Sequence, residues 1–171
     1  MRARNELLLA DLVALRAEKM PDLEVLTFER GEAPAEVRSY ADLDRNAHRI
    51  AAALVARGLG RGERFGLMLR NHPEFVEAMI AASITGTVFV PIDPRTRGEK
   101  LAYTLRNSGC RGMICADYCL SSVDAVRRGL PSLAWLLALE TGEDRDAVPL
   151  ASVAGAASLR EALAKPAARV E

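Results

Sequence analysis

Four short apolar runs constrain the fold of this 171-residue chain more than any other feature. Each run is apolar on consecutive positions, whereas a strand with one solvated face alternates apolar and polar residues. Such runs are typical of strands buried on both faces, as in a parallel sheet, although the last run fits a short helix equally well. The runs are FGLML at 65–69, VFVPI at 88–92, GMICA at 112–116 and LAWLLAL at 133–139.

The segments between the runs have helical periodicity, and Gly86 and Gly109 fit the ends of two of the expected helices. Each segment has room for one crossover helix, which a parallel pair of strands requires. The sequence therefore predicts an α/β fold whose mainly parallel sheet contains the first three runs and has flanking helices. The expected helices lie near 40–57, 73–85 and 98–107, with a weaker one around Val123 and Val126.

The helix expected after the first run shows how the pattern assigns a buried face. Asn71 fits the N-cap and Pro73 fits the first turn. One apolar stripe is predicted to face the sheet, while Glu74 and Glu77 lie off it in solvent. We therefore expect Phe75→Ala to disrupt the fold and Glu77→Ala to be tolerated. The stripe consists of Phe75, Val76, Met79, Ile80 and Ile84.

The strongest helical pattern is SYADLDRNAHRIAAALVARGLG, at the helix expected near 40–57. His48 lies off its apolar stripe and is predicted to be a solvated surface histidine. Glu36, Asp42 and Asp44 gather near the helix start, where carboxylates favour the helix dipole, so capping is their expected role. The predicted buried stripe is Leu43, Ala47, Ile50, Ala51, Leu54 and Val55.

The two flanking regions have weaker patterns. Upstream, strands are expected at 24–30 and 36–40. Downstream, the periodicity fades, and we interpret 140–171 as a linker or surface segment with one short helix around 158–164. The expected organisation is an α/β unit at 1–139 followed by that segment.

Asp93 and Pro94 directly follow the second apolar run. In open α/β sheets, ligands bind in the loops outside the carboxyl ends of the strands. This loop is therefore the position at which the sequence predicts contact with a ligand, although the pattern alone does not assign cofactor-binding residues.

The charge balance argues against two classes of partner. Lys plus Arg and Asp plus Glu are 23 each, so the net charge is zero and neither nucleic acid nor an anionic membrane is expected as a partner. No apolar run approaches the length of a membrane span. We expect a soluble cytoplasmic protein.

Three cysteines, Cys110, Cys115 and Cys119, lie close together in the sequence. An odd number argues against a disulfide framework. The histidines lie in other elements, whereas zinc needs about four convergent ligands. Buried or idle thiols are expected, and no metal site.

Known catalytic motifs are missing from the chain. The segment GLGRGERFG has its third glycine misplaced for a dinucleotide loop and follows a helix instead of a strand, so it is interpreted as a helix end and a turn. There is no phosphate-binding P-loop, nucleophile elbow or zincin pair, and Ser83 and Ser108 have no base nearby in sequence. No catalytic residue is predicted.

In order along the chain, five segments resemble the opening of adenylate-forming (AMP-binding) enzymes. This family includes the acyl-CoA synthetases, the luciferases and the adenylation domains of peptide synthetases, and the most similar branch is the fatty-acid and carnitine-type CoA ligases. Each segment is weak evidence alone, but the order of all five is specific. They are SYADL, GLGRGERFGLML, NHPEF, ITGTVFVPIDP and KLAYTLRNSG, between about residues 22 and 120.

The resemblance implies two half-reactions: a carboxylic acid and ATP form an acyl-adenylate and pyrophosphate, and CoA then displaces AMP. It implies ATP, Mg²⁺ and CoA as cofactors of a full-length enzyme, none of them assigned to residues here. It also implies that the chain is the first subdomain of the large N-terminal domain, with the PIDP loop on the acyl/CoA side of the cleft.

Departures from the family pattern limit what this chain is expected to do. The family's Ser/Thr/Gly-rich phosphate loop, adenine-binding aromatic motif, ribose-binding aspartate and C-terminal lysine are all missing. Phosphoryl and adenylyl chemistry depends on such groups, so we expect an inactive N-terminal part of a longer ligase, with self-association through exposed apolar surface. The alternative is a standalone non-catalytic module that binds a nucleotide, CoA or a partner protein. A Rossmann-type oxidoreductase ranks third, because its glycine fingerprint is missing.

Overall fold

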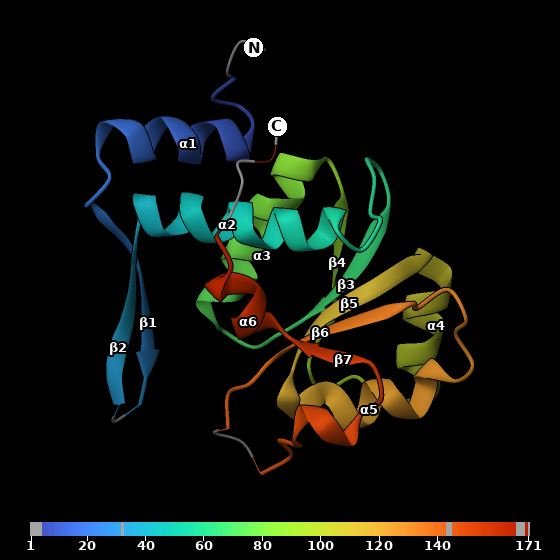
Figure 1. The fold of residues 1–171 in the computed structure, drawn as a ribbon. Coiled ribbons are helices and arrows are strands. Elements are labelled where there is room, and N and C mark those ends of the chain that lie inside the picture. The colour runs from blue at the N-terminus through green and yellow to red at the C-terminus, as the bar shows by residue number, and fades with distance from the viewer. Residues whose placement is uncertain (1–4, 32, 143–144, 167–169, 171) are drawn as a thin grey trace.

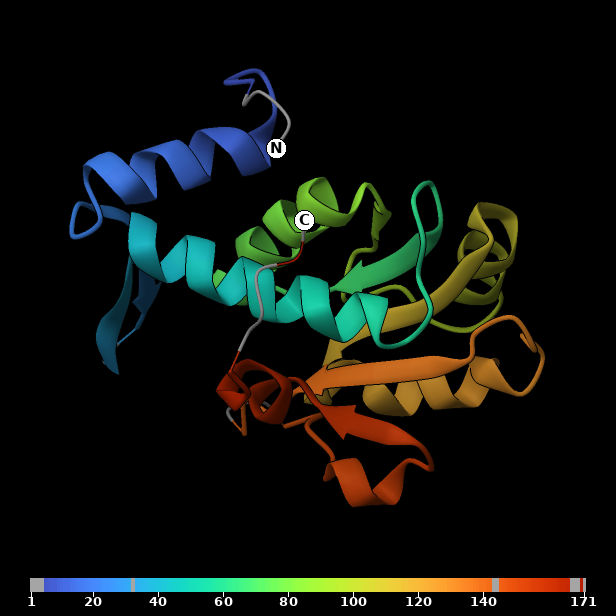
Figure 2. The same cartoon turned by 45° about the horizontal axis from the view of Figure 1, so that its top comes forward.

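A sheet of five parallel strands, in the order β4-β3-β5-β6-β7, organises the part of the chain that the structure describes, residues 5–31, 33–142, 145–166 and 170. In this computed structural model, α2 and α3 lie on one face of the sheet with α1 outside them, while α4 and α5 lie on the other (Figures 1 and 2). A separate antiparallel hairpin, β1–β2, projects beside α2. The elements are α1 (Leu9–Lys19), β1 (Glu24–Arg30), β2 (Ala33–Ser39), α2 (Tyr40–Val55), β3 (Arg64–Met68), α3 (Pro73–Thr85), β4 (Val88–Pro91), α4 (Gly98–Ser108), β5 (Cys110–Ala116), α5 (Asp117–Arg127), β6 (Trp135–Leu139), the 3₁₀ turn η1 (Leu150–Ser152), β7 (Ala156–Ser158) and α6 (Leu159–Ala164).

The predicted α/β architecture is confirmed. Strand β3 pairs in parallel with both β4 and β5, and the ambiguous run at 133–139 contains strand β6, parallel to β5. Helices α3 and α4 end at Gly86 and Gly109, whose φ values of 68° and 66° suit glycine. The segment after α2 is a turn with Gly58 and Gly62 at positive φ, so the helix-end interpretation of GLGRGERFG also holds.

The N-terminus of α2 is fixed by a reciprocal cap. The Ser39 hydroxyl accepts a hydrogen bond from the Asp42 backbone N–H, and the Asp42 carboxylate accepts one from the Ser39 backbone N–H. The capping role holds for Asp42 but not for its neighbours: Glu36 pairs with Arg38, and Asp44 lies 3.7 Å from His48 Nε2.

Strand β4 is not buried as its apolar run predicts. It is the edge strand of the sheet, with β3 as its only neighbour, so one side of its backbone lacks a strand partner among the described residues. Val88 is consequently 43% exposed. Consecutive apolar residues distinguished strand from loop but did not distinguish the edge of this sheet from its centre.

Helix α3 differs most from its predicted faces. Glu74 and Glu77 are buried, with Glu77 at 0% exposure, whereas Phe75 is only partly buried. Ile80 packs with Val13, Leu43 and Ala47 instead of against the sheet, which contacts the small residues Ala78, Ala81 and Ala82. The prediction fails because α3 is enclosed between the sheet and the α1–α2 layer, so a single apolar stripe does not define its buried side.

Three smaller predictions are also wrong. The N-cap of α3 is His72 and not Asn71, and Val55 is 49% exposed because it ends α2. The side chain of His48 is only 12% exposed, because it lies between Asp44 and the backbone N–H of Val170, which donates to its Nδ1.

Residues beyond 139 also contribute to the fold. Strand β7 extends the sheet beside β6, and Val153 and Leu159 belong to the main core. The sheet therefore continues through part of the segment interpreted as a linker, while the helix expected around 158–164 is present as α6.

Candidate functional site

The order of the strands places a crevice between the carboxyl ends of β3 and β5. The chain leaves β3 toward α3 and β4 on one side, and leaves β5 toward α5 and β6 on the other. Adjacent strands whose connections diverge in this way form a topological switch point, where open α/β sheets bind ligands. The segments that meet here are the loop that begins at Leu69 and the first turn of α5, which begins at Asp117.

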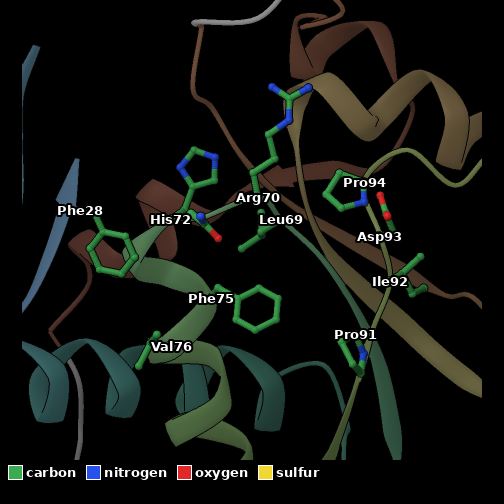
Figure 3. A pocket seen from close by; sticks show the side chains of 11 residues that line it. Phe28, Leu69, Arg70, His72, Phe75, Val76, Pro91, Ile92, Asp93 and Pro94 are labelled. Carbon is green, nitrogen blue, oxygen red and sulfur yellow. The ribbon is translucent and has the colours of Figure 1, made fainter. Parts of the chain in front are cut away.

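An open cleft of about 640 Å³ adjoins this crevice (Figure 3). Its walls come from the loop after β3, the first turns of α3, the loop after β4 and one side chain of β1. Most of these walls are apolar, and Arg70, His72 and Asp93 are charged or titratable groups near its rim. The lining residues are Phe28, Leu69, Arg70, Asn71, His72, Phe75, Val76, Pro91, Ile92, Asp93 and Pro94.

Tyr118, in the first turn of α5, contacts the loop after β3. Its hydroxyl accepts a hydrogen bond from the Arg70 backbone N–H at 2.8 Å and lies 3.1 Å from His72 Nε2. The guanidinium of Arg70 lies over its ring, 4.4 Å from the centroid. Burial raises the pKa of Tyr118 to about 12, so its hydroxyl keeps its proton at neutral pH.

A smaller and more polar hollow of about 390 Å³ lies on the other side of Arg70 and His72. Glu29, Glu36, Tyr118 and Thr141 contribute to its lining. The site therefore consists of an apolar cleft and a polar hollow that share Phe28 and the segment 70–72.

Asp117 attaches the loop after β6 to this region. Its carboxylate accepts hydrogen bonds from the backbone N–H groups of Thr141 and Gly142, from the Thr141 hydroxyl and from the Tyr118 N–H, at 2.6 to 2.9 Å. A buried carboxylate needs such donors, since 4% exposure leaves it little water. The role of Asp117 is structural, because these bonds occupy both oxygens.

The loop after β4 carries two basic residues, Arg95 and Arg97, directly after the lining residues Asp93 and Pro94. Arg95 binds both oxygens of Asp93, and these hydrogen bonds hold the pKa of Asp93 well below its usual range. Arg97 is the N-cap of α4, whose helix dipole places partial positive charge at the same point. Burial raises the pKa of the nearby Cys119 to about 11, while the charges of Arg97 and Arg70 act in the opposite direction.

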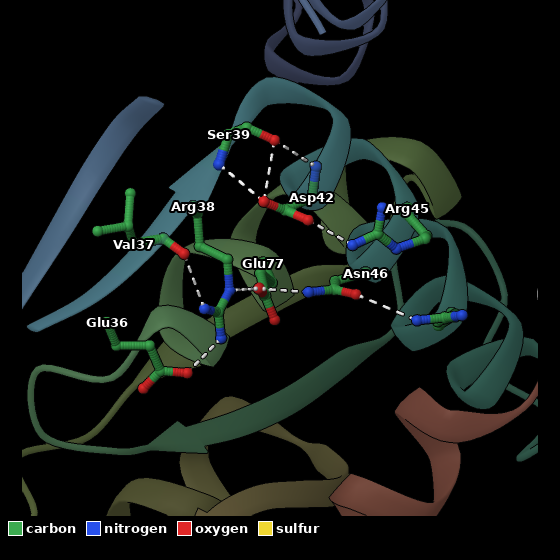
Figure 4. A network of polar contacts seen from close by, with 9 residues as sticks. Glu36, Val37, Arg38, Ser39, Asp42, Arg45, Asn46 and Glu77 are labelled. Atoms are coloured by element: carbon green, nitrogen blue, oxygen red, sulfur yellow. Dashed lines mark hydrogen bonds and ion pairs between the residues drawn. The ribbon is translucent and has the colours of Figure 1, made fainter. Parts of the chain in front are cut away.

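A polar network centred on the buried Glu77 links the β1–β2 hairpin to α2 and α3 (Figure 4). Arg38 Nε and Asn46 Nδ2 each donate to Oε1 of Glu77 at 2.8 Å, and Arg38 also pairs with Glu36. Burial raises the pKa of Glu77, and the hydrogen bonds from Asn46 and Arg38 offset part of the rise. Because Glu36 faces Phe28 across the β1–β2 hairpin, this network fixes the hairpin strand that brings Phe28 to the cleft.

The loop of Asp93 and Pro94 does line a cleft, as its position after β4 predicts. Sequence reasoning missed Arg70, His72 and Tyr118, although each lies within three residues of the end of an apolar run, as Asp93 does. Ser83 and Ser108 do not join the site: Ser83 accepts from the Ala10 N–H, and Ser108 donates to the Thr104 carbonyl.

The three cysteines are buried and carry no disulfide. In the described portion of the chain, no group of three or more His, Cys, Asp or Glu side chains is arranged to hold a metal ion. Nor does any helix there have the length and apolar character needed to cross a membrane.

Comparisons with known proteins agree with the fold. Residues 13–169 match the family model described as AMP-binding enzyme. A medium/long-chain-fatty-acid–CoA/3-oxocholest-4-en-26-oate–CoA ligase of Mycobacterium marinum is 28% identical over 81% of this chain and 24% of its own length. A crotonobetaine/carnitine–CoA ligase of Salmonella paratyphi A is 36% identical over 54% of this chain and 18% of its own length.

A solved structure has the same fold. Acetoacetyl-CoA synthetase from Streptomyces lividans superposes with a TM-score of 0.81 at 21% identity, over 95% of this chain and 26% of that one. The chain thus spans about a quarter of the length of this protein and of the mycobacterial relative.

Proposed function

The chain belongs to the AMP-binding enzyme family, and from this membership we propose that it is the N-terminal part of an ATP-dependent carboxylic acid–CoA ligase. The match over residues 13–169 carries the proposal, and the names of the two ligases and the synthetase favour acid–CoA chemistry over other reactions of the family. The whole enzyme would form an acyl-adenylate from the acid and ATP, and then an acyl-CoA.

In this proposal the basic rim of the cleft contacts the phosphate groups of CoA. Arg70 lines the cleft, and Arg95 and Arg97 follow its lining residues Asp93 and Pro94 directly in the chain, so their guanidiniums can reach a phosphate bound there. The N-terminus of the 11-residue helix α4 has no side-chain cap and offers backbone N–H groups at the same point. The apolar walls between Phe28 and Ile92 suit the uncharged part of an acyl or pantetheine chain. Tyr118 acts as a positioning residue, because it holds the backbone and the guanidinium of Arg70.

Adenylation itself is assigned to residues outside this chain. The described residues provide no cluster of metal ligands that could hold Mg²⁺. The chain also has no Ser/Thr/Gly-rich loop to hold the phosphates of ATP. We therefore expect the 171 residues alone to be inactive.

ATP–pyrophosphate exchange with short to long carboxylic acids tests this assignment. The expected result is no acid-dependent exchange above an empty-vector control. Exchange that depends on the acid would show that the chain contains an adenylation site, and the assignment would be wrong.

The alternative, a standalone module without catalysis, is distinguished at the level of the gene. If the nucleotide sequence after codon 171 continues in frame into a Ser/Thr/Gly-rich loop, the ligase is favoured. An immediate stop codon would favour the module.

Two weaker expectations belong to the same proposal. Three reduced, buried cysteines fit a cytoplasmic location. The exposed edge of β4 and Leu7, 91% exposed, favour self-association of this chain. Analytical sedimentation of the parent and of Val88→Lys tests self-association, since only the parent should associate. Equal association of both proteins would argue against an interface at the β4 edge.

A further inference from the structure

A groove of about 270 Å³ lies between α2 and the β7–α6 segment, away from the cleft at the strand ends. Arg49 and Arg57 approach it from α2 and the turn that follows, and Lys165 approaches from the end of α6. Small side chains leave the space between these three cations open. They are Ala52, Ala53, Ala56, Ala157 and Ala162.

Neither arginine has an acidic partner among the described residues. Arg57 donates to the carbonyl of Ala53 at 2.9 Å and lies over the ring of Trp135. Burial lowers the pKa of Arg57, and no carboxylate opposes this change. The guanidinium is therefore partly desolvated without a counter-charge.

Arg49 has even fewer contacts. Its Nη1 donates to Asn46 Oδ1 at 3.4 Å, and its Nε is buried without a hydrogen-bond partner in the described structure. A guanidinium presents its donors in a planar fork that matches two oxygens of one anion. Reorienting Arg49 toward an anion would break only the long bond to Asn46.

The acids near the groove do not neutralise it. Glu161 lies on its rim but forms no ion pair with the described cations, and Glu140 accepts a hydrogen bond from Ser158 instead. Half-buried cations without counter-ions are unusual in folded proteins, because desolvation disfavours them. Among the described residues, three cations and one exposed carboxylate line the groove, which gives this part of it an excess of positive charge.

We propose that this groove binds a short polyphosphate anion, with Arg49 and Arg57 each engaging a different phosphate group. Arg49 enters the groove from α2 and Arg57 from the turn after it. Linked phosphates offer each guanidinium its own pair of oxygens, so a polyphosphate can engage both at once. The small volume and the alanine floor favour a compact anion over a nucleic acid or a peptide.

Calorimetric titration of the full chain with pyrophosphate, phosphate and sulfate at constant ionic strength tests the proposal. We expect saturable binding of pyrophosphate and much weaker binding of the other two anions. Arg49→Gln and Lys165→Gln should each weaken pyrophosphate binding about tenfold, the loss typical of one charge-assisted contact. Arg57 is left intact because it covers Trp135.

The control variant is Arg106→Gln, which removes one exposed positive charge from α4, outside the groove. Equal weakening by Arg106→Gln would show that binding follows net charge, and the proposal would be wrong. The absence of saturable pyrophosphate binding would also contradict the proposal. In an NMR titration with pyrophosphate, the largest changes in backbone amide chemical shift should lie at Ala53 and Ala157, and largest changes at Arg95 and Arg97 would contradict it as well. Unchanged urea midpoints would establish that the variants are folded.

Discussion

Glu77→Ala tests the buried network most sharply, because sequence pattern and structure give opposite expectations. Glu77 is fully buried, and its Oε1 accepts hydrogen bonds from Arg38 and Asn46. The substitution leaves both donors without this acceptor and opens a cavity. Removing one partner of a buried ion pair typically costs about 3–5 kcal/mol. We expect about 3 kcal/mol, since Arg38 keeps its contact with Glu36.

Urea unfolding followed by circular dichroism measures this loss. The matched control is Glu99→Ala in the first turn of α4, where the glutamate is exposed and its loss should change stability by within about 0.5 kcal/mol. Glu77→Gln should lie between the two, because its amide oxygen still accepts from both donors. If Glu77→Ala unfolded at the parent's midpoint, the network would not hold the hairpin against α3.

Three further predictions concern neighbouring parts of the fold. A Cβ on Gly112 would lie 1.9 Å from the indole of Trp135, so Gly112→Ala should lower the stability of the protein by about 1–3 kcal/mol. A thermal midpoint equal to that of the parent would contradict this contact. Asp117→Ala should release the loop after β6, seen as faster hydrogen exchange at Thr141 and Gly142 while amides in β3 keep their protection; unchanged exchange at those two residues would refute the anchoring role. Burial raises the pKa of Glu74 above 4.5, so the contribution of Glu74 to folding stability is complete below about pH 4.5 and is lost as the pH rises through the raised pKa. Glu74→Gln should therefore be more stable than the parent near pH 7 but not near pH 4. An equal difference in stability at both pH values would argue against a buried carboxylate.

The sheet was predictable because its central strands are desolvated on both sides. Runs such as 65–69 and 112–116 contain only residues that tolerate complete burial, and the glycines after α3 and α4 mark where those helices end. These signals depend on local sequence, so they can be detected without knowledge of the tertiary contacts.

The remaining errors depend on neighbours that are distant in the sequence. Glu77 is buried because Arg38 and Asn46 reach it from β2 and α2, and no periodicity in α3 encodes those partners. Val88 is exposed because β5 pairs on the opposite side of β3, and a run of apolar residues does not specify strand order. The contact between Arg70 and Tyr118 likewise joins the loop after β3 to the first turn of α5, 48 positions further along the chain.

Binding of CoA to the 171-residue chain tests the central claim most directly, because it asks whether the basic rim of the cleft recognises CoA. Isothermal titration should show saturable binding that is weakened in the Arg95→Gln/Arg97→Gln variant and retained in Arg128→Gln, a charge change at the far end of α5. Absence of CoA binding by the folded parent, or equal weakening by both variants, would contradict the account.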